Sequence, residues 1–132
     1  MKLTYSQISD AYDIIKELSE LKLPFRLSLL ISKILSLISK EYEFYLEQER
    51  KFVFEYLLID KQTGNLVQTM PGVCKIQEGK EQECQKAREA LDNFEVEMDI
   101  KKIPASMLEP FEFTPAQLAA IDFMIEEEEE HD

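Results

Sequence analysis

The first 22 residues place apolar and charged side chains with the period of an α-helix. The apolar positions recur at steps of three or four residues and are Ile8, Ala11, Tyr12, Ile15, Leu18 and Leu21. A single apolar face of this kind is typical of a helix that packs on a core. Thr4 followed by Gln7 fits a capping box, so we expect a helix over residues 4–22.

A second and much longer helical pattern begins at Pro24, which suits the first turn of a helix because its missing N–H costs nothing there. No Gly or Pro occurs between Pro24 and Gly64, and the helical period continues to about Leu58. Such a helix would be on the order of 50 Å long. Its first half, residues 25–38, is apolar on more than one face. We therefore expect this half to be buried on two sides, or to lie against another subunit.

The sequence of residues 53–59 is compatible with either a strand or the end of the long helix. They are rich in β-forming side chains and precede a strong turn signal at residues 60–65. A strand pairing with residues 66–69 is therefore one alternative. We favour the end of the long helix, because the helical period continues directly into this segment.

A third helix is expected over residues 80–93. The side chains expected to face inward are Cys84, Ala87, Ala90 and Leu91. Residues 94–100 then alternate strictly between apolar and acidic side chains, which predicts a half-buried strand. We expect this strand to pair with a short strand at residues 73–77, because a small hairpin is stable only when it packs on something else, here the helices.

The chain ends in a short helix and an acidic run. Thr114, Pro115 and Gln117 form a strong helix start, with an N-cap, a proline in the first position and a capping box. A short apolar stripe follows, and the run of acidic residues starts at Glu126. We expect this helix to dock on the core of its own chain rather than on a neighbour.

Together these elements predict a mainly α fold with a small β element (α+β). In this fold a long helix packs with an N-terminal helix and a third helix, and a small β-hairpin and a short C-terminal helix complete it. The length of 132 residues fits one domain. We expect a helical core with a hairpin over residues 1–103. Residues 104–132 would form a linker, the short helix and an acidic tail, either in the same domain or as a docking appendage.

The net charge of −12 is concentrated at the C-terminal end. Residues 1–102 hold all 15 Lys and Arg against 18 acidic residues, whereas residues 103–132 hold nine acidic residues and no Lys or Arg. A run of five glutamates, such as Glu126–Glu130, repels itself and is usually solvated. This acidity argues against direct nucleic-acid binding and favours solubility or contact with a basic partner surface.

The composition excludes several kinds of catalytic and cofactor site. One histidine, three glycines and no tryptophan leave no parts for a multi-histidine zinc site, a Ser-His-Asp triad, a Rossmann turn or a P-loop. Cys74 and Cys84 are expected to be free thiols. Glu95, Glu97 and Asp99 place three carboxylates on one strand face, which could suit a divalent metal, but we favour a solvated face. We therefore expect no catalytic residue, cofactor, metal site or membrane segment.

The long helix points to protein binding instead. Its serines recur every three or four residues and could either let another helix approach closely or simply form a mildly polar side of the helix. Its second half is rich in aromatic side chains that suit either a core or a protein-binding surface. Our candidate partner-binding residues are Leu29, Ser32, Ser36, Leu37, Phe44, Phe54, Phe123 and Ile125.

Five segments, taken in order, resemble a family of small bacteriophage and prophage proteins of unknown function. They are Lys22-Leu23-Pro24, Tyr42 to Arg50, Asp60 to Asn65, Glu95-Val96-Glu97-Met98-Asp99-Ile100, and Thr114-Pro115 through Glu126. The resemblance implies a phage setting and brings no catalytic residues. We expect a non-enzymatic protein of the host cytoplasm or the virion that acts in virion assembly or as a minor structural component. Its partner would be a phage structural protein, a host protein or a second copy of the chain. The alternative is an acidic host-takeover or anti-defence inhibitor that blocks a host nucleic-acid-binding protein.

Overall fold

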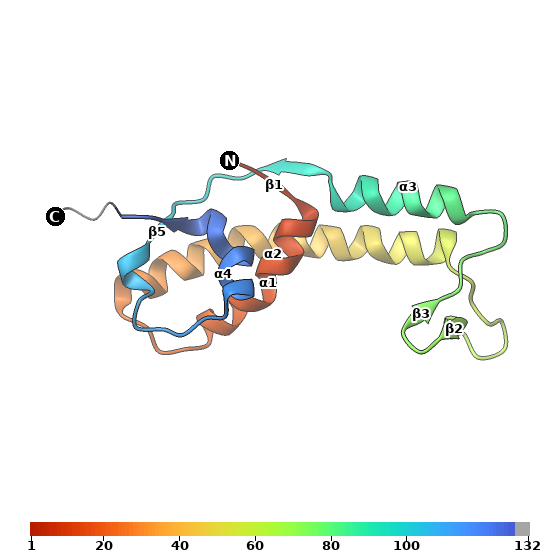
Figure 1. Cartoon of the computed structure of the whole chain (residues 1–132), viewed down its shortest axis with the longest axis horizontal. Coiled ribbons are helices and arrows are strands. Elements are labelled where there is room, and N and C mark those ends of the chain that lie inside the picture. The colour runs from red at the N-terminus through yellow and green to blue at the C-terminus, as the bar shows by residue number, and fades with distance from the viewer. Residues whose placement is uncertain (129–132) are drawn as a thin grey trace. The chain divides into compact units, whose positions relative to one another are not determined.

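The computed structural model describes residues 1–128 (Figure 1). The α-helices are α1 (Tyr5–Ser19), α2 (Phe25–Tyr56), α3 (Glu81–Asp92) and α4 (Pro115–Ile121), and the short 3-10 helices are η1 (Ala105–Met107) and η2 (Asp122–Met124). The strands are β1 (Lys2–Thr4), β2 (Gln68–Met70), β3 (Val73–Cys74), β4 (Glu95–Glu97), β5 (Ile103–Pro104) and β6 (Ile125–Glu126). The predicted class, mainly α with a small β element, is confirmed. The last part of the predicted acidic tail, residues 129–132, lies outside the described residues.

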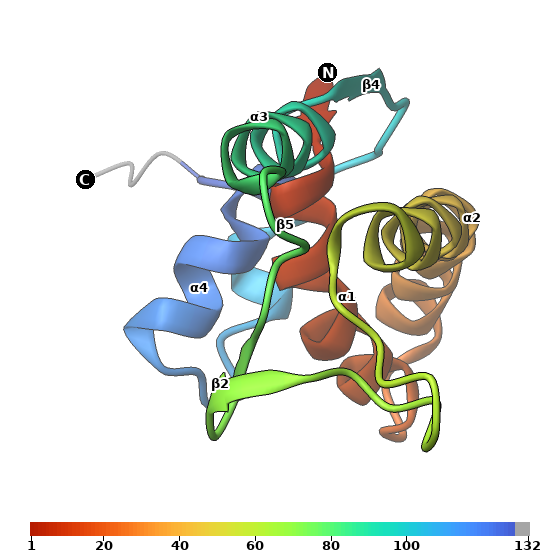
Figure 2. The same cartoon turned by 90° about the vertical axis from the view of Figure 1, so that its right-hand side faces the viewer.

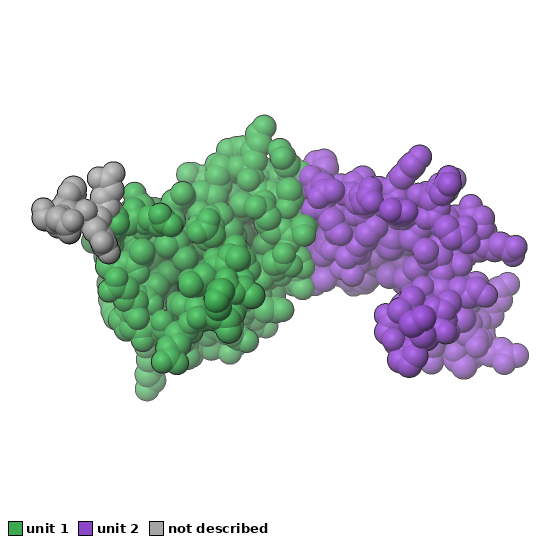
Figure 3. All heavy atoms as spheres, in the orientation of Figure 1, with its two compact units in different colours: residues 1–42, 95–132 green, residues 43–94 purple. Residues whose placement is uncertain are grey.

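The chain is organised in two compact units, shown in different colours in Figure 3. Unit 1 consists of residues 1–42 and 95–132, and unit 2 consists of residues 43–94. The long helix α2 contributes its first part to unit 1 and the rest to unit 2. The segment that follows residue 103, predicted as a linker and short helix, belongs to unit 1 together with α1.

Helix α1 forms as its sequence predicts. The Oγ1 atom of Thr4 accepts a hydrogen bond from the backbone N–H of Gln7 at 3.1 Å, and Oε1 of Gln7 accepts one from the backbone N–H of Thr4 at 2.9 Å. This capping box satisfies two of the N–H groups that a helix start leaves without partners. The apolar stripe Ile8, Ala11 and Ile15 is fully buried.

Helix α2 begins directly after Pro24, whose carbonyl accepts a hydrogen bond from the N–H of Ser28 at 2.9 Å. It ends at Tyr56, two residues before the expected end. The β-forming residues that follow make only isolated antiparallel bridges, from Leu57 to Ile76 and from Ile59 to Leu66. The helical period therefore determines the structure as far as Tyr56, and the strand alternative applies only beyond it.

The predicted pairing of residues 73–77 with residues 94–100 is wrong. Strand β3 pairs instead with β2, antiparallel and directly before it in the chain. A tight turn joins the two strands, and its Gly72 has a φ of +84°, a conformation that glycine adopts at no steric cost. Closing so short a loop costs less chain entropy than bringing two segments about 20 residues apart together.

Strand β4 pairs with β1 at the start of the chain. The pairing is antiparallel, with Leu3 opposite Val96, and Leu3 is buried. The predicted alternation is confirmed only in part: Met98 and Ile100 are buried and Asp99 is exposed, but Phe94 is 58% exposed and the strand itself covers only Glu95–Glu97. The sequence pattern does not indicate a strand at residues 2–4, so it does not reveal the partner of β4.

The C-terminal helix docks on its own chain, as expected. Thr114 caps α4 with a second complete capping box, and α4 lies beside α1 in unit 1 (Figure 2). Ile121 and Met124 have no exposed surface. Beyond η2 the chain forms β6, which pairs parallel with β5, so Ile125 lies in a strand and not in the helix.

Helix α3 confirms the third predicted helix, with one correction to its inward face. Cys84 is buried, and Ala87 and Leu91 are partly buried, but Ala90 is exposed. At 3.6 residues per turn, Ala90 lies about 100° around the helix from Leu91, which takes its side chain off the packed face.

Candidate functional site

One side of α2 in unit 1 is not covered by the described residues. Leu27, Leu30, Ile31, Ile34 and Ile38 form its buried side. On the opposite side Phe25 is 83% exposed and Leu29 43% exposed, and Ser32 and Ser36 are exposed beside them. These four residues, spaced by four, three and four, form a single stripe that we call the α2 face. The sequence predicts that residues 25–38 are either buried on two sides or lie against another subunit. Within residues 1–128 they are not buried on two sides.

A row of basic side chains borders the α2 face. Arg26, Lys33 and Lys40 follow one another at steps of seven residues, about 10 Å apart, and helical geometry places them within about 60° of Leu29. Residues 21–40 hold four basic residues and no acidic residue, in a chain whose net charge is −12. None of the three forms an ion pair with any other residue in 1–128. We call these three residues the basic row.

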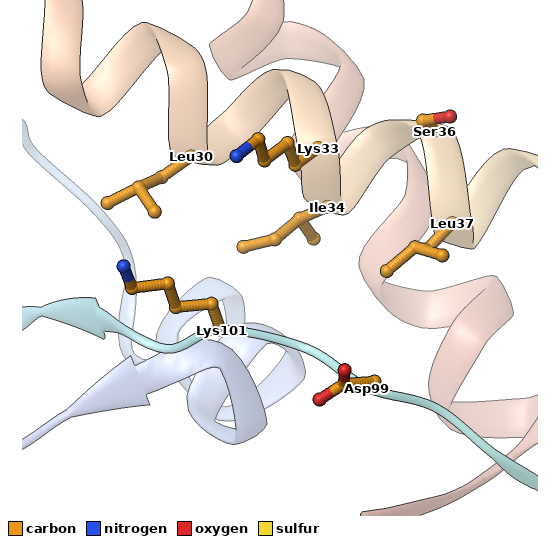
Figure 4. Close-up of a pocket in the computed structure, with 7 residues that line it drawn as sticks. All are labelled: Leu30, Lys33, Ile34, Ser36, Leu37, Asp99 and Lys101. Atoms are coloured by element: carbon orange, nitrogen blue, oxygen red, sulfur yellow. The ribbon is translucent and has the colours of Figure 1, made fainter.

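A cavity of about 320 Å³ opens beside the basic row, between α2 and the segment that follows β4 (Figure 4). Its lining residues are Leu30, Lys33, Ile34, Ser36, Leu37, Asp99 and Lys101. The three aliphatic side chains point from α2 toward residues 99–101, while the hydroxyl of Ser36 points away. The cavity therefore combines an apolar wall with two ammonium groups and one carboxylate. It brings together two of the predicted residues, Ser36 and Leu37.

A larger groove of about 740 Å³ lies elsewhere in unit 1, around η1 and the start of α4. Its apolar residues are Ala105, Leu108, Phe111, Phe113, Leu118 and Ile125. Its charged residues are all acidic and are Glu109, Glu112, Asp122 and Glu127. No Lys or Arg of the described chain forms an ion pair with any of these four carboxylates. We call this site the acidic groove.

Of the remaining predicted residues, only Ile125 lies on one of these surfaces. Ile125 is part of the acidic groove, but Phe123 lines a different and smaller cavity with Gln7 and Asp10. Phe54 is 71% exposed, and Phe54 and Phe44 both belong to unit 2. The eight predicted residues therefore do not form one site. Four of them lie on α2 in unit 1, at the α2 face or beside it.

A polar cluster in unit 2, which the sequence did not predict, joins α2 to α3. The hydroxyl of Tyr45 donates a hydrogen bond to Oδ1 of Asp92 at 2.9 Å and accepts one from Nη2 of Arg88 at 2.9 Å. Arg88 also pairs with Oδ2 of Asp92 at 3.2 Å and with Glu49 at 3.6 Å. Burial, followed by the hydrogen bond to Asp92, raises the pKa of Tyr45 well above its usual value. The four-residue spacing of Arg88 and Asp92 indicates that these two side chains can pair on a helix. It does not reveal their shared partner Tyr45, which lies 43 residues or more away in sequence.

The expected carboxylate row does not form a metal centre in the part of the chain described. Glu95, Glu97 and Asp99 are exposed, and among residues 1–128 no three His, Cys, Asp or Glu side chains come close enough to hold a metal ion.

Cys74 and Cys84 are free thiols, and burial raises the pKa of Cys84. No helix within residues 1–128 is long and apolar enough to cross a membrane.

No family model, curated protein or solved structure matches this chain. The resemblance to small phage proteins therefore stays a prediction from the sequence.

Proposed function

We propose that this chain is a non-enzymatic binding protein that uses the α2 face and the basic row to hold another protein. The observation that carries the proposal is the uncovered apolar stripe on α2, bordered by three cations that have no ion-pair partner within residues 1–128. A helix of a soluble protein normally turns its apolar side to the core and a mixed polar side to water. In α2 a Phe and a Leu lie on the water side and no carboxylate accompanies them from residue 21 to residue 40.

The chemistry of this surface specifies the partner. Phe25 and Leu29 gain free energy when they are taken out of water, at roughly 25 cal/mol per Å² of apolar area. Ser32 and Ser36 are small enough for a helix to approach α2 closely. The basic row favours carboxylates around the apolar contact. The partner is therefore an apolar protein surface with acidic side chains at its border.

The phage setting of this proposal rests on the sequence resemblance alone. In that setting the partner is a phage structural protein, and the chain acts in virion assembly or as a minor structural component, in the host cytoplasm or in the virion.

The acidic groove supports a second candidate function. Its four carboxylates have no ion-pair partner within residues 1–128, and they suit a basic surface of a host nucleic-acid-binding protein. In this alternative the chain is an acidic inhibitor in host takeover or anti-defence, and the groove rather than α2 is its binding site.

A capture experiment with matched variants separates these functions. The tagged protein, its Leu29→Glu variant and its Leu46→Glu variant are incubated with lysate of phage-infected bacteria, and the captured proteins are quantified by mass spectrometry. Leu46 is 37% exposed and lies on the part of α2 that belongs to unit 2, so Leu46→Glu is the control. We expect Leu29→Glu to reduce capture of the partner at least tenfold and Leu46→Glu to leave it unchanged. A partner held equally by all three proteins would contradict the proposal. A fourth protein, the Glu112→Lys variant, changes the acidic groove, and loss of capture in this variant alone would favour the inhibitor.

A further inference from the structure

We propose that the partner of the α2 face is a second copy of this chain, which receives the face in its acidic groove. This inference rests on the proposed function and names its partner. The two surfaces share no residue, and both lie within unit 1. One copy therefore presents α2 while its own groove stays available to another.

Complementary charge selects this occupant. The basic row brings three cations, Arg26, Lys33 and Lys40, to one edge of the α2 face. The groove presents Glu109, Glu112, Asp122 and Glu127 around its apolar part, and within residues 1–128 neither set has an ion-pair partner. Opposite charges on two surfaces guide their encounter and fix the register of the contact. Contact between two copies would give each set the counter-charges that it lacks within one chain.

The apolar parts of the two surfaces are also complementary. A helix that binds in a groove is held by side chains spaced three, four or seven residues apart. Phe25 and Leu29 have this spacing and are exposed. The groove offers Phe111, Phe113 and Leu118 as apolar contacts, and Leu118 is 42% exposed in the isolated chain. The contact therefore buries apolar surface on both copies.

A contact between two different surfaces closes after two copies only if the copies bind reciprocally, each α2 face in the groove of the other copy. Otherwise each copy added offers one free α2 face and one free groove, so the assembly grows into a ring or an open chain. A contact between two α2 faces would instead be symmetric and would stop at a dimer. This difference makes the proposal testable without knowledge of any other partner.

The first measurement is sedimentation equilibrium of the purified protein between 10 and 500 µM. We expect the weight-average mass to rise above that of the monomer with concentration at 50 mM salt. At 500 mM salt we expect it to fall toward that of the monomer, because salt screens the charged contacts. A monomer at 500 µM in 50 mM salt would overturn the inference and leave the proposed function to the capture experiment.

The decisive measurement combines two variants, each with one surface inactivated. Arg26→Glu with Lys33→Glu reverses the basic row, and Glu109→Lys with Glu112→Lys reverses part of the groove. We expect each variant alone to be monomeric. Mixed in equal amounts they should associate, because the mixture contains one intact α2 face for each intact groove and because the reversed row and the reversed groove are again opposite in charge. If the mixture stays monomeric, or if the groove variant alone still associates, the contact is not the one proposed.

Control variants carry the same change of charge at other sites. Glu43→Lys with Glu47→Lys matches the groove variant, and Lys51→Glu with Lys61→Glu matches the α2 variant. All four of these side chains are exposed and belong to unit 2. We expect both controls to associate like the unmodified chain. If a charge-reversed variant fails to fold by circular dichroism, Leu29→Ser replaces the α2 variant and Leu118→Ser replaces the groove variant, with the same expected results.

Discussion

At the scale of single residues, a network of polar side chains connects α2 and α3 in unit 2, where few apolar side chains are buried. Tyr45 and Cys84 are the only buried apolar residues described there. Tyr45, Arg88 and Asp92 satisfy one another in a network, and the guanidinium of Arg88 also lies 5.6 Å from the ring centre of Phe52. In unit 2 polar contacts therefore hold α3 on α2 where apolar burial is scarce.

Tyr45→Phe tests this network. The substitution keeps the ring but leaves Oδ1 of Asp92 and Nη2 of Arg88 without their shared hydroxyl. Leaving a partly buried polar group unsatisfied costs about 1–3 kcal/mol, so we expect a loss of about 1–2 kcal/mol in the free energy of unfolding, measured with urea. Tyr12→Phe is the control, because Tyr12 contacts Tyr42 through its stacked ring, which the substitution preserves. Equal losses in the two variants would contradict the role of the hydroxyl.

A second residue predicts how stability depends on pH. Burial, followed by the nearby carboxylate of Glu41, raises the pKa of Tyr5 to about 12, and its hydroxyl donates to Oε2 of Glu41 at 3.2 Å. The folded state holds this proton more tightly than the unfolded state, whose tyrosine has a pKa near 10. This contribution is fully present below pH 10 and is lost as the pH rises through 12.

Tyr5→Phe should therefore be less sensitive to alkaline pH. Between pH 9 and 12 we expect the unmodified chain to lose on the order of 2 kcal/mol more stability than the variant. Chemical denaturation at four pH values measures the difference. Parallel stability curves for the two proteins would show that Tyr5 does not titrate as described.

At the scale of elements, the packing of α4 against α1 links the two ends of unit 1. Ile121 has no exposed surface, whereas Leu118 on the same short helix is 42% exposed. Ile121→Ala should cost about 2–4 kcal/mol in unfolding free energy, because it leaves a cavity in the core. Leu118→Ala should cost less than 1 kcal/mol. Similar losses from the two substitutions would mean that α4 is not docked through the face described.

The helices could be predicted from the sequence because each depends on local information. Periodic apolar positions and the capping boxes at Thr4 and Thr114 give both the helix type and its start. The partners of the strands could not be predicted in this way. Alternation in residues 94–100 shows that a strand has one buried face, but it does not identify the strand that pairs with it. That partner, Lys2–Thr4, is three residues long and runs directly into a helix cap.

The candidate surfaces could be predicted only where their residues lie on a single helix. Leu29, Ser32 and Ser36 lie on α2, so helical spacing alone places them on one face. The acidic groove combines side chains of an irregular segment, a helix and a strand. Only Ile125 among its residues was selected from the sequence. Phe111 and Phe113 flank Glu112 in a segment without periodicity. This mixture of aromatic and acidic residues is the only feature of the sequence that indicates the groove.

At the scale of the whole molecule, buried apolar surface is divided unequally between the units. Of the 19 buried apolar residues in the described part of the chain, 17 belong to unit 1 and two to unit 2. Regions with few buried apolar contacts open locally at a lower free-energy cost than the global unfolding of the protein. Unit 1, which contains both candidate surfaces, therefore has the larger apolar core to hold their geometry.

Hydrogen exchange followed by mass spectrometry tests this division. We expect backbone amides of α3 and of residues 57–76 to exchange at least tenfold faster than those of α1, because unit 2 loses few apolar contacts when it opens. Tyr45→Phe should accelerate exchange in α3 further and leave α1 unchanged, since the cluster of Tyr45, Arg88 and Asp92 lies wholly within unit 2. Ile15→Ala, the converse variant, removes a fully buried side chain of α1 and should accelerate exchange throughout unit 1. Uniform protection across both units, or an equal response of α1 and α3 to Tyr45→Phe, would show that the chain opens as one cooperative unit.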